Sequence, residues 1–405
     1  MKIRVLGAGY AGVRAALDLD WRLGRRGVRV TLVNAGPDHE LITELHRPAA
    51  GTRVSVLAVP LADIFAGTGV EVVQGTVTDI RLGDREFVVD GRRVFGFDYL
   101  VVALGSEPEY FSIPGLQEHS LTLRSLNSAE NIRRHIDDMM DRARRTEDPG
   151  QRQAMLTIVV AGGGLTGVEF AGELADKRIA LALRHGLRPD EIRIVTVEAA
   201  PDILPGFDEP LVDAAVDMLL RKGVSLLLGT GIVGVDGDGV VLRDGTRLRS
   251  RTVVWSGGVR ANRLVERVFT TRARGRAVVN RYLQSVDAPG VYVIGDAALA
   301  LNPRTGQPVP PTAQHAVVQG RLAARNIWAE IVGRPLRAYT GRTAGVVATV
   351  GRGAGLARIG PLRMAGWLPA FLKDLNTWRY LHDLGGARLV FRALLRQRSL
   401  RWAGA

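Results

Sequence analysis

Two glycine-rich turns in different halves of the chain restrict its fold more than any other feature. The first turn, Gly7–Gly12, follows the apolar run 3–6, and the second, Gly162–Gly167, follows the apolar run 156–161. Each lies between a predicted buried strand and a predicted helix, the context in which this pattern binds a dinucleotide pyrophosphate. The helix N-terminus then offers unpaired N–H groups to the phosphates. Two turns predict two dinucleotide sites, and a bound flavin with a visiting nicotinamide is one pair that fits.

The two halves of the chain repeat one order of elements. In the first half, strands over 2–6 and 28–33 flank a helix over 11–23. After a polar link over 146–153, the second turn restarts the same order, with its next strand over 192–198. This long-period duplication predicts an α/β fold with two Rossmann-like dinucleotide-binding domains plus a small C-terminal segment.

Composition limits the chemistry that the chain can perform. Its length of 405 residues and hydrophobic content of 46% are typical of a globular protein of about two to three domains. There is no cysteine, which excludes disulfides, cysteine-ligated metals and a redox-active dithiol, so electron transfer must use an organic cofactor. The histidines show no metal-ligand spacing, and we expect no metal site. A strand starting at Lys2 leaves no room for a secretory signal, which favours a cytoplasmic location.

Positive charge is concentrated at the C-terminal end. The formal net charge is +13, and from Arg352 onward the only acidic residues are Asp374 and Asp383. Anionic lipid or an acidic partner would match this charge. The basic residues form no recognisable nucleic-acid module, so we expect no nucleic-acid partner.

Five polar residues stand where a dinucleotide could meet them. Glu198 ends the second strand of its half, where a carboxylate accepts ribose hydroxyls and repels a 2′-phosphate, so it favours NADH over NADPH. The uncharged Asn34 stands at the matching place in the first half and departs from that pattern. Asp296 could bind the ribityl chain of a flavin or cap a helix. Glu169 and Gln314 lie in the first turns of predicted helices and either face a ligand or are ordinary polar residues.

These motifs together resemble the type II NADH dehydrogenases, single-subunit NADH:quinone oxidoreductases that do not pump protons. The resemblance covers nearly the whole chain, and an uncharged residue at Asn34 is normal in that family. It is carried by Gly7–Gly12, by 32–52, by 162–173, by Val197–Asp208, by Thr252–Val259, by Gly295-Asp296 and by Pro310–Gln314.

The resemblance implies the fold of the disulfide-reductase-like flavoproteins, with non-covalent FAD, NADH and a quinone-like acceptor. It implies an FAD-binding domain over 1–120 and 280–335, an NADH-binding domain over 121–279 and a C-terminal membrane-surface or dimerisation segment over 336–405. Glu169 and Gln314 would be the catalytic residues near the flavin ring. The cofactor-binding residues would be Gly7, Gly9, Tyr10, Ala11, Gly12, Asn34, Val77, Ala103, Gly105, Asp296, Ala313, Gly162, Gly164, Gly167, Glu198 and Gly258.

One departure from the family's pattern, together with the C-terminal tail, leaves the identity of the electron acceptor open. Val318 replaces the second glutamine of the family's Ala-Gln-x-Ala-x-Gln pattern. An alternative is therefore a soluble NADH-dependent flavoenzyme acting on a small aromatic or quinone-like metabolite, and a non-enzymatic NADH sensor is a third reading.

The tail carries two helical stripes. Apolar residues recur at helical spacing from Trp367 to Leu381, and a basic stripe follows at Arg388, Arg392 and Arg396, with a break at Gly385-Gly386. Such a tail suits a peripheral position on the cytoplasmic face of a membrane, or packing on the protein body. The oligomeric state, including a homodimer, stays open.

Overall fold

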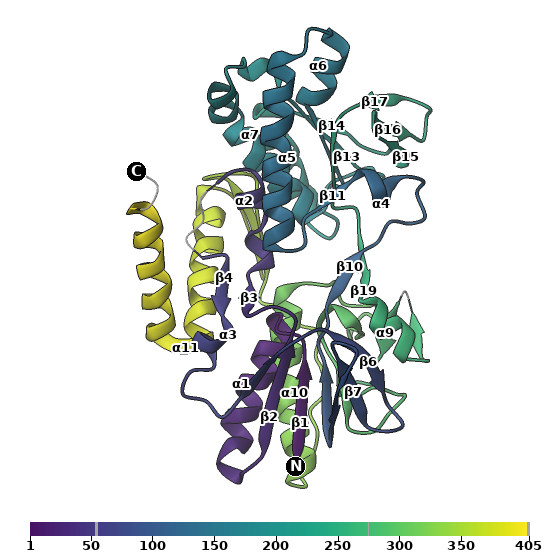
Figure 1. The fold of residues 1–405 in the computed structure, drawn as a ribbon, viewed down its shortest axis with the longest axis vertical. Helices are drawn as coiled ribbons and strands as arrows, with labels where there is room; N and C mark the ends of the chain where they lie inside the picture. The colour runs from purple at the N-terminus through teal and green to yellow at the C-terminus, as the bar shows by residue number, and fades with distance from the viewer. Residues whose placement is uncertain (53–55, 274, 403–405) are drawn as a thin grey trace.

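The computed structural model describes residues 1–52, 56–273 and 275–402, with side chains described up to residue 394. It contains two lobes, each built on a five-stranded parallel sheet, with the C-terminal segment lying alongside both (Figure 1).

The first lobe is built on the sheet β22-β9-β1-β2-β5. Its strands are β1 (Lys2–Leu6), β2 (Arg29–Asn34), β5 (Glu71–Gln74), β9 (Tyr99–Val102) and β22 (Val291–Val293). Ile3, Val5 and Leu6 of the central strand are fully buried, because helices and a second layer cover both faces of a parallel sheet. The helices α1 (Tyr10–Leu23) and α10 (Ala313–Ile331) pack against each other. A three-stranded antiparallel sheet adds β6 (Val77–Arg81), β7 (Glu86–Val89) and β8 (Arg93–Gly96).

The second lobe repeats this plan with the sheet β11-β18-β12-β13-β14. Its strands are β11 (Leu121–Thr122), β12 (Thr157–Ala161), β13 (Arg193–Val197), β14 (Val224–Leu227) and β18 (Thr252–Trp255). Its long helices are α5 (Leu126–Arg145), α7 (Leu165–His185) and α8 (Glu209–Arg221), and its antiparallel sheet contains β15 (Ile232–Asp236), β16 (Gly239–Leu242) and β17 (Arg247–Arg249). The predicted fold class is therefore confirmed, with parallel pairing of strands around each glycine turn.

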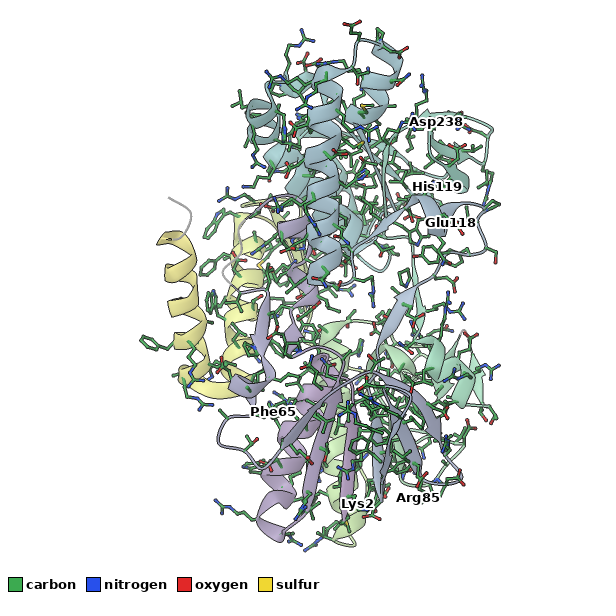
Figure 2. The ribbon with its side chains drawn as sticks, in the orientation of Figure 1. Lys2, Phe65, Arg85, Glu118, His119 and Asp238 are labelled. Atoms are coloured by element: carbon green, nitrogen blue, oxygen red, sulfur yellow. The ribbon has the colours of Figure 1, made fainter. Side chains whose placement is uncertain are left out.

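Two antiparallel strands, β10 (Ser106–Pro108) and β19 (Val259–Ala261), connect the lobes. Figure 1 shows this pair between the two sheets. Lys2 and Arg85 lie at the end of the first lobe far from this connection, whereas Glu118, His119 and Asp238 lie on the second lobe (Figure 2). The connection thus lies in the middle of the molecule (Figure 1).

Short elements fill the connections between these strands and helices. In chain order they are η1 (Gly24–Arg26), β3 (Asp38–Glu40), η2 (Ile42–Glu44), α2 (His46–Ala49), β4 (Ala58–Pro60), α3 (Leu61–Ile64), α4 (Leu116–His119), α6 (Pro149–Leu156), η3 (Pro189–Glu191), α9 (Arg263–Val268), β20 (Arg272–Ala273), β21 (Arg276–Val278), η4 (Gly295–Ala297) and β23 (Ala298–Leu299). The prediction of a polar link over 146–153 was partly wrong. Asp148 caps α6 by accepting from the Gln151 N–H at 2.6 Å, and Pro149 stands at the first helical position.

The C-terminal segment forms the sheet β24 (Val346–Thr349), β25 (Gly355–Ile359) and β26 (Leu362–Gly366), followed by α11 (Trp367–Trp402). The predicted break is confirmed, because Gly385 and Gly386 are non-helical inside α11. No helix among the described residues is long and apolar enough to cross a membrane.

The predicted apolar stripe of the tail divides into two parts. Trp367, Phe371 and Leu375 are more than half exposed, whereas Leu381 is fully buried in the core of the first lobe and Trp378 packs against that core. Packing on the protein body is therefore confirmed for the stretch around Leu381, while the membrane-surface position stays a prediction for the exposed stretch around Trp367.

The predicted basic stripe does not face outward as a whole. Arg388 donates to the carbonyl oxygens of Asp63 and Ala66, and Arg392 pairs with the Asp63 carboxylate at 2.5 Å. The side chain of Arg396 lies outside the described part. Two of the three arginines thus hold the second half of α11 to the protein body.

Candidate active site

The first glycine turn connects β1 to α1. Gly7 has a φ of +98°, and a Cβ on Gly12 would lie 1.9 Å from the Gly7 carbonyl oxygen, so both positions require glycine. Gly9 has open space where a side chain would stand. It precedes α1, and no described side chain caps that helix. The first N–H groups of α1 are therefore free to bind an anion.

The second turn connects β12 to α7 and has the same geometry. Gly162 has a φ of +114°, and a Cβ on Gly167 would lie 1.9 Å from the Gly162 carbonyl oxygen. Gly164 has open space and precedes α7, which no described side chain caps. This site too can accept a phosphate at a helix N-terminus.

The strand-end residues close onto these turns. Asn34 accepts the Ala8 N–H at 2.9 Å and donates to the Gly36 carbonyl at 2.9 Å. Glu198 accepts the Gly163 N–H at 2.5 Å. Each side chain therefore touches its own turn, and their roles in ribose binding stay predictions.

Several other predicted residues gather at the first turn. A Cβ on Gly7 would lie 2.4 Å from the Ala103 carbonyl oxygen, and a Cβ on Gly295 would lie 3.3 Å from Ala11. Gly105 has a φ of +70° and accepts the Asn262 N–H at 3.2 Å beside the connecting strands.

The remaining predicted residues lie at element ends. Val77 begins β6, Ala313 begins α10 and Tyr10 begins α1. Gly258 accepts the Glu109 N–H at 3.1 Å between β18 and β19. Their roles in cofactor binding stay predictions.

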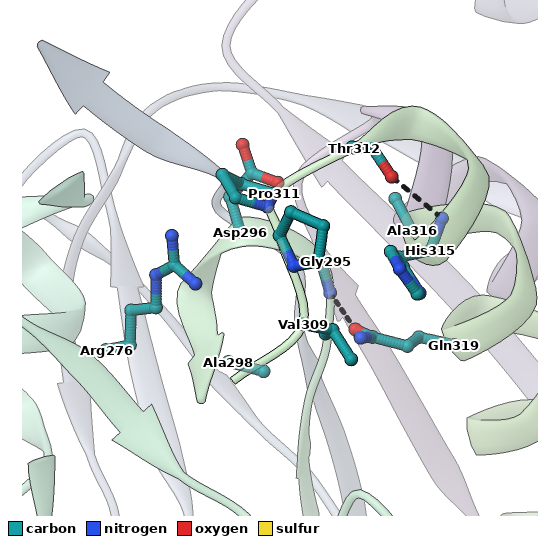
Figure 3. A pocket seen from close by; sticks show the side chains of 11 residues that line it. Arg276, Gly295, Asp296, Ala298, Val309, Pro311, Thr312, His315, Ala316 and Gln319 are labelled. Atoms are coloured by element: carbon teal, nitrogen blue, oxygen red, sulfur yellow. Dashed lines mark hydrogen bonds between the residues drawn. The ribbon is translucent and has the colours of Figure 1, made fainter. Parts of the chain in front are cut away.

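A small polar pocket adjoins Asp296 at the end of the first lobe's sheet. Asp296 accepts from the Ser106 hydroxyl at 2.7 Å, and Arg124 donates to the Ser106 carbonyl at 2.7 Å. The Gly295 N–H donates to Gln319 Oε1 at 2.7 Å (Figure 3). The pocket is lined by Arg276, Gly295, Asp296, Ala298, Val309, Pro310, Pro311, Thr312, His315, Ala316 and Gln319.

Sequence reasoning missed the residues that hold this pocket. Burial lowers the pKa of Arg124, while the nearby Asp296 and Glu107 oppose that shift. The position of Ser106, directly after Gly105, is the one local signal that could have found it. Arg124 has no such signal, because it reaches Ser106 from the second lobe.

Glu169 lies in a separate cluster where α7 meets the C-terminal segment. Its carboxylate accepts from Lys373 Nζ at 2.6 Å and from the Thr349 N–H at 3.0 Å. His46 Nδ1 lies 3.5 Å from the other carboxylate oxygen. Glu169, Lys373 and His46 are all buried, so this is an ion pair enclosed by protein.

A second carboxylate shares this cluster. Glu44 is 2% exposed, accepts from the Thr377 hydroxyl at 3.1 Å and pairs with Arg47 at 3.3 Å. Burial raises the pKa of Glu44, although Lys373 and Arg47 oppose that shift. Burial lowers the pKa of His46 well below 6.5, so its ring is neutral at pH 7. The cluster therefore holds at least one group that binds a proton more readily than usual.

Gln314 is exposed in the first turn of α10, a different helix from the α7 that carries Glu169. Val318, one turn further along, is partly buried and packs against the core of the first lobe. Its neighbour Gln319 is buried and carries the amide that binds Gly295. Although Val318 has no amide, the polar pocket therefore still contains the amide of Gln319.

Known proteins share this architecture. Residues 1–320 match the family model described as pyridine nucleotide-disulphide oxidoreductase. The type II NADH:quinone oxidoreductases of Staphylococcus saprophyticus and Staphylococcus aureus are each 33% identical over 395 residues, which cover 96% of this chain and 98% of theirs.

Solved structures match over the whole molecule. The structure of NDH2 from Plasmodium falciparum in complex with NADH has a TM-score of 0.86 at 18% identity and covers 100% of this chain and 98% of that one. The sulfide:quinone oxidoreductase of Aquifex aeolicus has a TM-score of 0.76 at 17% identity and covers 95% and 91%. At these identities the two structures support the fold.

Proposed function

Because the chain belongs to the type II NADH:quinone oxidoreductases, within the pyridine nucleotide-disulphide oxidoreductase family, we propose that it oxidises NADH and reduces a quinone through a bound FAD. The observation that carries this function is the pair of glycine turns, each open at an uncapped helix N-terminus. When bound, FAD supplies the redox chemistry, and the protein supplies position and electrostatics. The absence of cysteine agrees with this division of roles, because no disulfide can take part.

The first turn would hold the pyrophosphate of FAD. Gly7, Gly9 and Gly12 allow the close approach of backbone and phosphate, and Asn34 lies beside the turn for the ribose. Asp296, with Ser106 and Arg124 behind it, would bind the ribityl hydroxyls, because a fixed carboxylate is a strong hydrogen-bond acceptor.

The second turn would hold NADH. Glu198 reaches this turn through Gly163 and offers a carboxylate to the adenosine ribose. A 2′-phosphate there would meet like charge, so the site favours NADH over NADPH.

Glu169 and Gln314 would serve the reaction from opposite sides. Glu169 is held by Lys373 and Thr349, a fixed geometry that suits a group holding or moving a proton. Gln314 presents an exposed neutral amide that can bind a quinone carbonyl. An unchanged NADH-to-quinone rate in Glu169→Gln would refute the proton role.

The outer face of α11 would contact a membrane. Trp367, Phe371 and Leu375 are 69%, 56% and 51% exposed and recur every four residues, which places them on one helix face. A peripheral position on the cytoplasmic face, and the homodimer, remain predictions.

Partitioning into anionic liposomes tests this contact. We expect replacement of Trp367, Phe371 and Leu375 by serine to reduce binding about tenfold or more. The matched control replaces Ile179, Leu183 and Leu220, which are comparably exposed on the second lobe. Equal partitioning of the two triple variants would instead favour the soluble flavoenzyme acting on a small quinone-like metabolite.

Stopped-flow spectroscopy tests the function as a whole. The purified yellow protein is mixed anaerobically with NADH and then with menaquinone and ubiquinone analogues, while the flavin absorbance is followed. We expect bleaching by NADH and recovery with quinone. A colourless protein that cannot be reconstituted with FAD, or a flavin that quinones do not reoxidise, would overturn the proposal.

A further inference from the structure

A hydrogen-bonded chain joins α11 to the first glycine turn. The Tyr380 hydroxyl lies 2.9 Å from His39 Nε2, and His39 Nδ1 lies 2.8 Å from the Ala8 carbonyl oxygen. Ala8 is inside the Gly7–Gly12 turn, and its N–H is held by Asn34. Both backbone polar groups of Ala8 are therefore fixed, the N–H by β2 and the carbonyl by α11 through His39.

The direction of each hydrogen bond follows from the chemistry of its partners. A carbonyl oxygen only accepts, so His39 Nδ1 carries the proton. His39 is fully buried, and burial lowers its pKa to about 4, so the ring is neutral and Nε2 is an acceptor. Tyr380 must then donate, and burial raises the pKa of its hydroxyl well above 10, which keeps the proton on it. The hydrogen bonds from Tyr380 through His39 to Ala8 therefore have a single set of donors and acceptors at neutral pH.

Aromatic packing adds a second contact to the same turn. Tyr10, the first residue of α1, meets the His39 ring edge-on at 5.1 Å and the Tyr380 ring at 4.9 Å. The Tyr10 hydroxyl lies 2.9 Å from the Thr43 hydroxyl, so its ring is also anchored at the far end. The three rings come from the turn, from β3 and from α11, and pairs of this kind contribute beyond their buried area.

Tyr380 is held firmly in its place on α11. Leu381 and Leu384 are buried in the core of the first lobe. Asp383, between them, pairs with Arg14 of α1 and Arg321 of α10. The helix therefore presents Tyr380 to His39 from a rigid support.

We propose that Tyr380 is a positioning residue for FAD. Tyr380 acts through His39, which keeps the peptide between Ala8 and Gly9 in the orientation that binds the pyrophosphate. Because His39 holds the Ala8 carbonyl, this peptide cannot turn its oxygen toward the phosphates, where the partial negative charge of the oxygen would be repelled by the negative phosphates. The inference rests on the proposed function, because it assumes that FAD occupies the first turn.

Release of FAD from the purified holoprotein tests this role. Tyr380→Phe removes one hydroxyl and keeps the ring, and we expect the FAD dissociation rate, measured by the fluorescence of freed flavin, to rise about tenfold. Tyr282→Phe is the matched control, since it makes the same chemical change at a ring that packs under Arg281 and whose carbonyl accepts from Asn326 of α10. Equal release rates in the two variants would overturn the proposal.

A double variant tests whether the effect passes through His39. His39→Asn keeps a side-chain N–H for the Ala8 carbonyl but cannot reach Tyr380. In that background, Tyr380→Phe should change the FAD release rate less than about twofold, because the link is already absent. A full tenfold effect there would show that Tyr380 acts by another route.

Phosphorus NMR gives a readout that a general loss of stability would not move. The pyrophosphate resonances of bound FAD should shift in Tyr380→Phe and stay unchanged in Tyr282→Phe, and unshifted resonances in both would overturn the proposal. This measurement also decides the matter if His39→Asn fails to retain FAD. A wild-type protein without FAD refutes the proposed function, whereas a wild type that holds FAD, with Tyr380→Phe like its control, refutes only the role of Tyr380.

Discussion

Replacing Lys373 by methionine tests the enclosed ion pair with Glu169. Methionine keeps most of the apolar stem and removes the ammonium that lies 2.6 Å from the Glu169 carboxylate. Glu44, 2% exposed in the same cluster, also loses a neighbouring positive charge. Removing one partner of a buried pair leaves an uncompensated charge, which costs about 3–5 kcal/mol. We therefore expect the free energy of unfolding to fall by about that amount at pH 7.

A second substitution should restore most of the free energy of unfolding that Lys373→Met loses. The double variant Lys373→Met/Glu169→Gln replaces both members of the ion pair by neutral side chains, while Glu44 keeps its partner Arg47. The amide oxygen introduced by Glu169→Gln can still accept from the Thr349 N–H. We expect the double variant to recover at least about 2 kcal/mol relative to Lys373→Met, which measures the coupling of the two side chains. Simple addition of the two single losses would contradict a direct ion pair.

Urea unfolding of the holoprotein, followed by tryptophan and flavin fluorescence, measures these differences. Arg392→Met is the control, because Arg392 pairs with Asp63 while its side chain is 45% exposed. Exposed pairs contribute about 0–1 kcal/mol. If Lys373→Met loses no more stability than Arg392→Met, the reasoning about the buried cluster is refuted.

Single contacts elsewhere in the molecule carry three further predictions. Gly12→Ala should prevent stable folding of the turn, since its Cβ would lie 1.9 Å from the Gly7 carbonyl oxygen, whereas Gly9→Ala should keep the urea midpoint and weaken FAD retention. Glu198→Gln should reduce the preference for NADH over NADPH in kcat/KM by about tenfold, because a like charge is removed. The free energy of unfolding of the wild type should fall by up to about 3 kcal/mol as the pH falls from 6.5 toward 4, because the His39 ring takes up a proton in the unfolded protein but not in the folded one. Urea unfolding at several pH values should show that His39→Asn lacks this part of the pH dependence.

The fold was predictable because its evidence is local. A glycine that must adopt a positive φ, such as Gly7 or Gly162, follows directly after an apolar strand, and the helix begins within the same few residues. Each turn thus specifies strand, turn and helix without reference to distant parts of the chain. The same is true of Asn34 and Glu198, whose places at strand ends are fixed by the parallel pairing beside each turn.

The partners of the candidate site residues were not predictable, because they are distant in sequence. Lys373 meets Glu169 across 204 residues, and Tyr380 meets His39 across 341. Helical periodicity states which residues of the tail share a face, but it does not state what that face packs against. For this reason Trp367 and Leu381, which belong to one predicted stripe, have opposite environments.

The first half of α11 carries an exposed apolar face and two buried polar contacts on one element. Trp367, Phe371 and Leu375 face outward, while Lys373 and Tyr380 face the protein and reach Glu169 and His39. A helix of this kind moves as a unit, since its backbone hydrogen bonds fix the spacing of its side chains. Displacing the outer face by the width of one side chain would therefore strain both inner contacts at once. If that face attaches to a membrane, as proposed, the attachment would hold the helix in place and would strengthen both the buried ion pair and the contact with the first glycine turn.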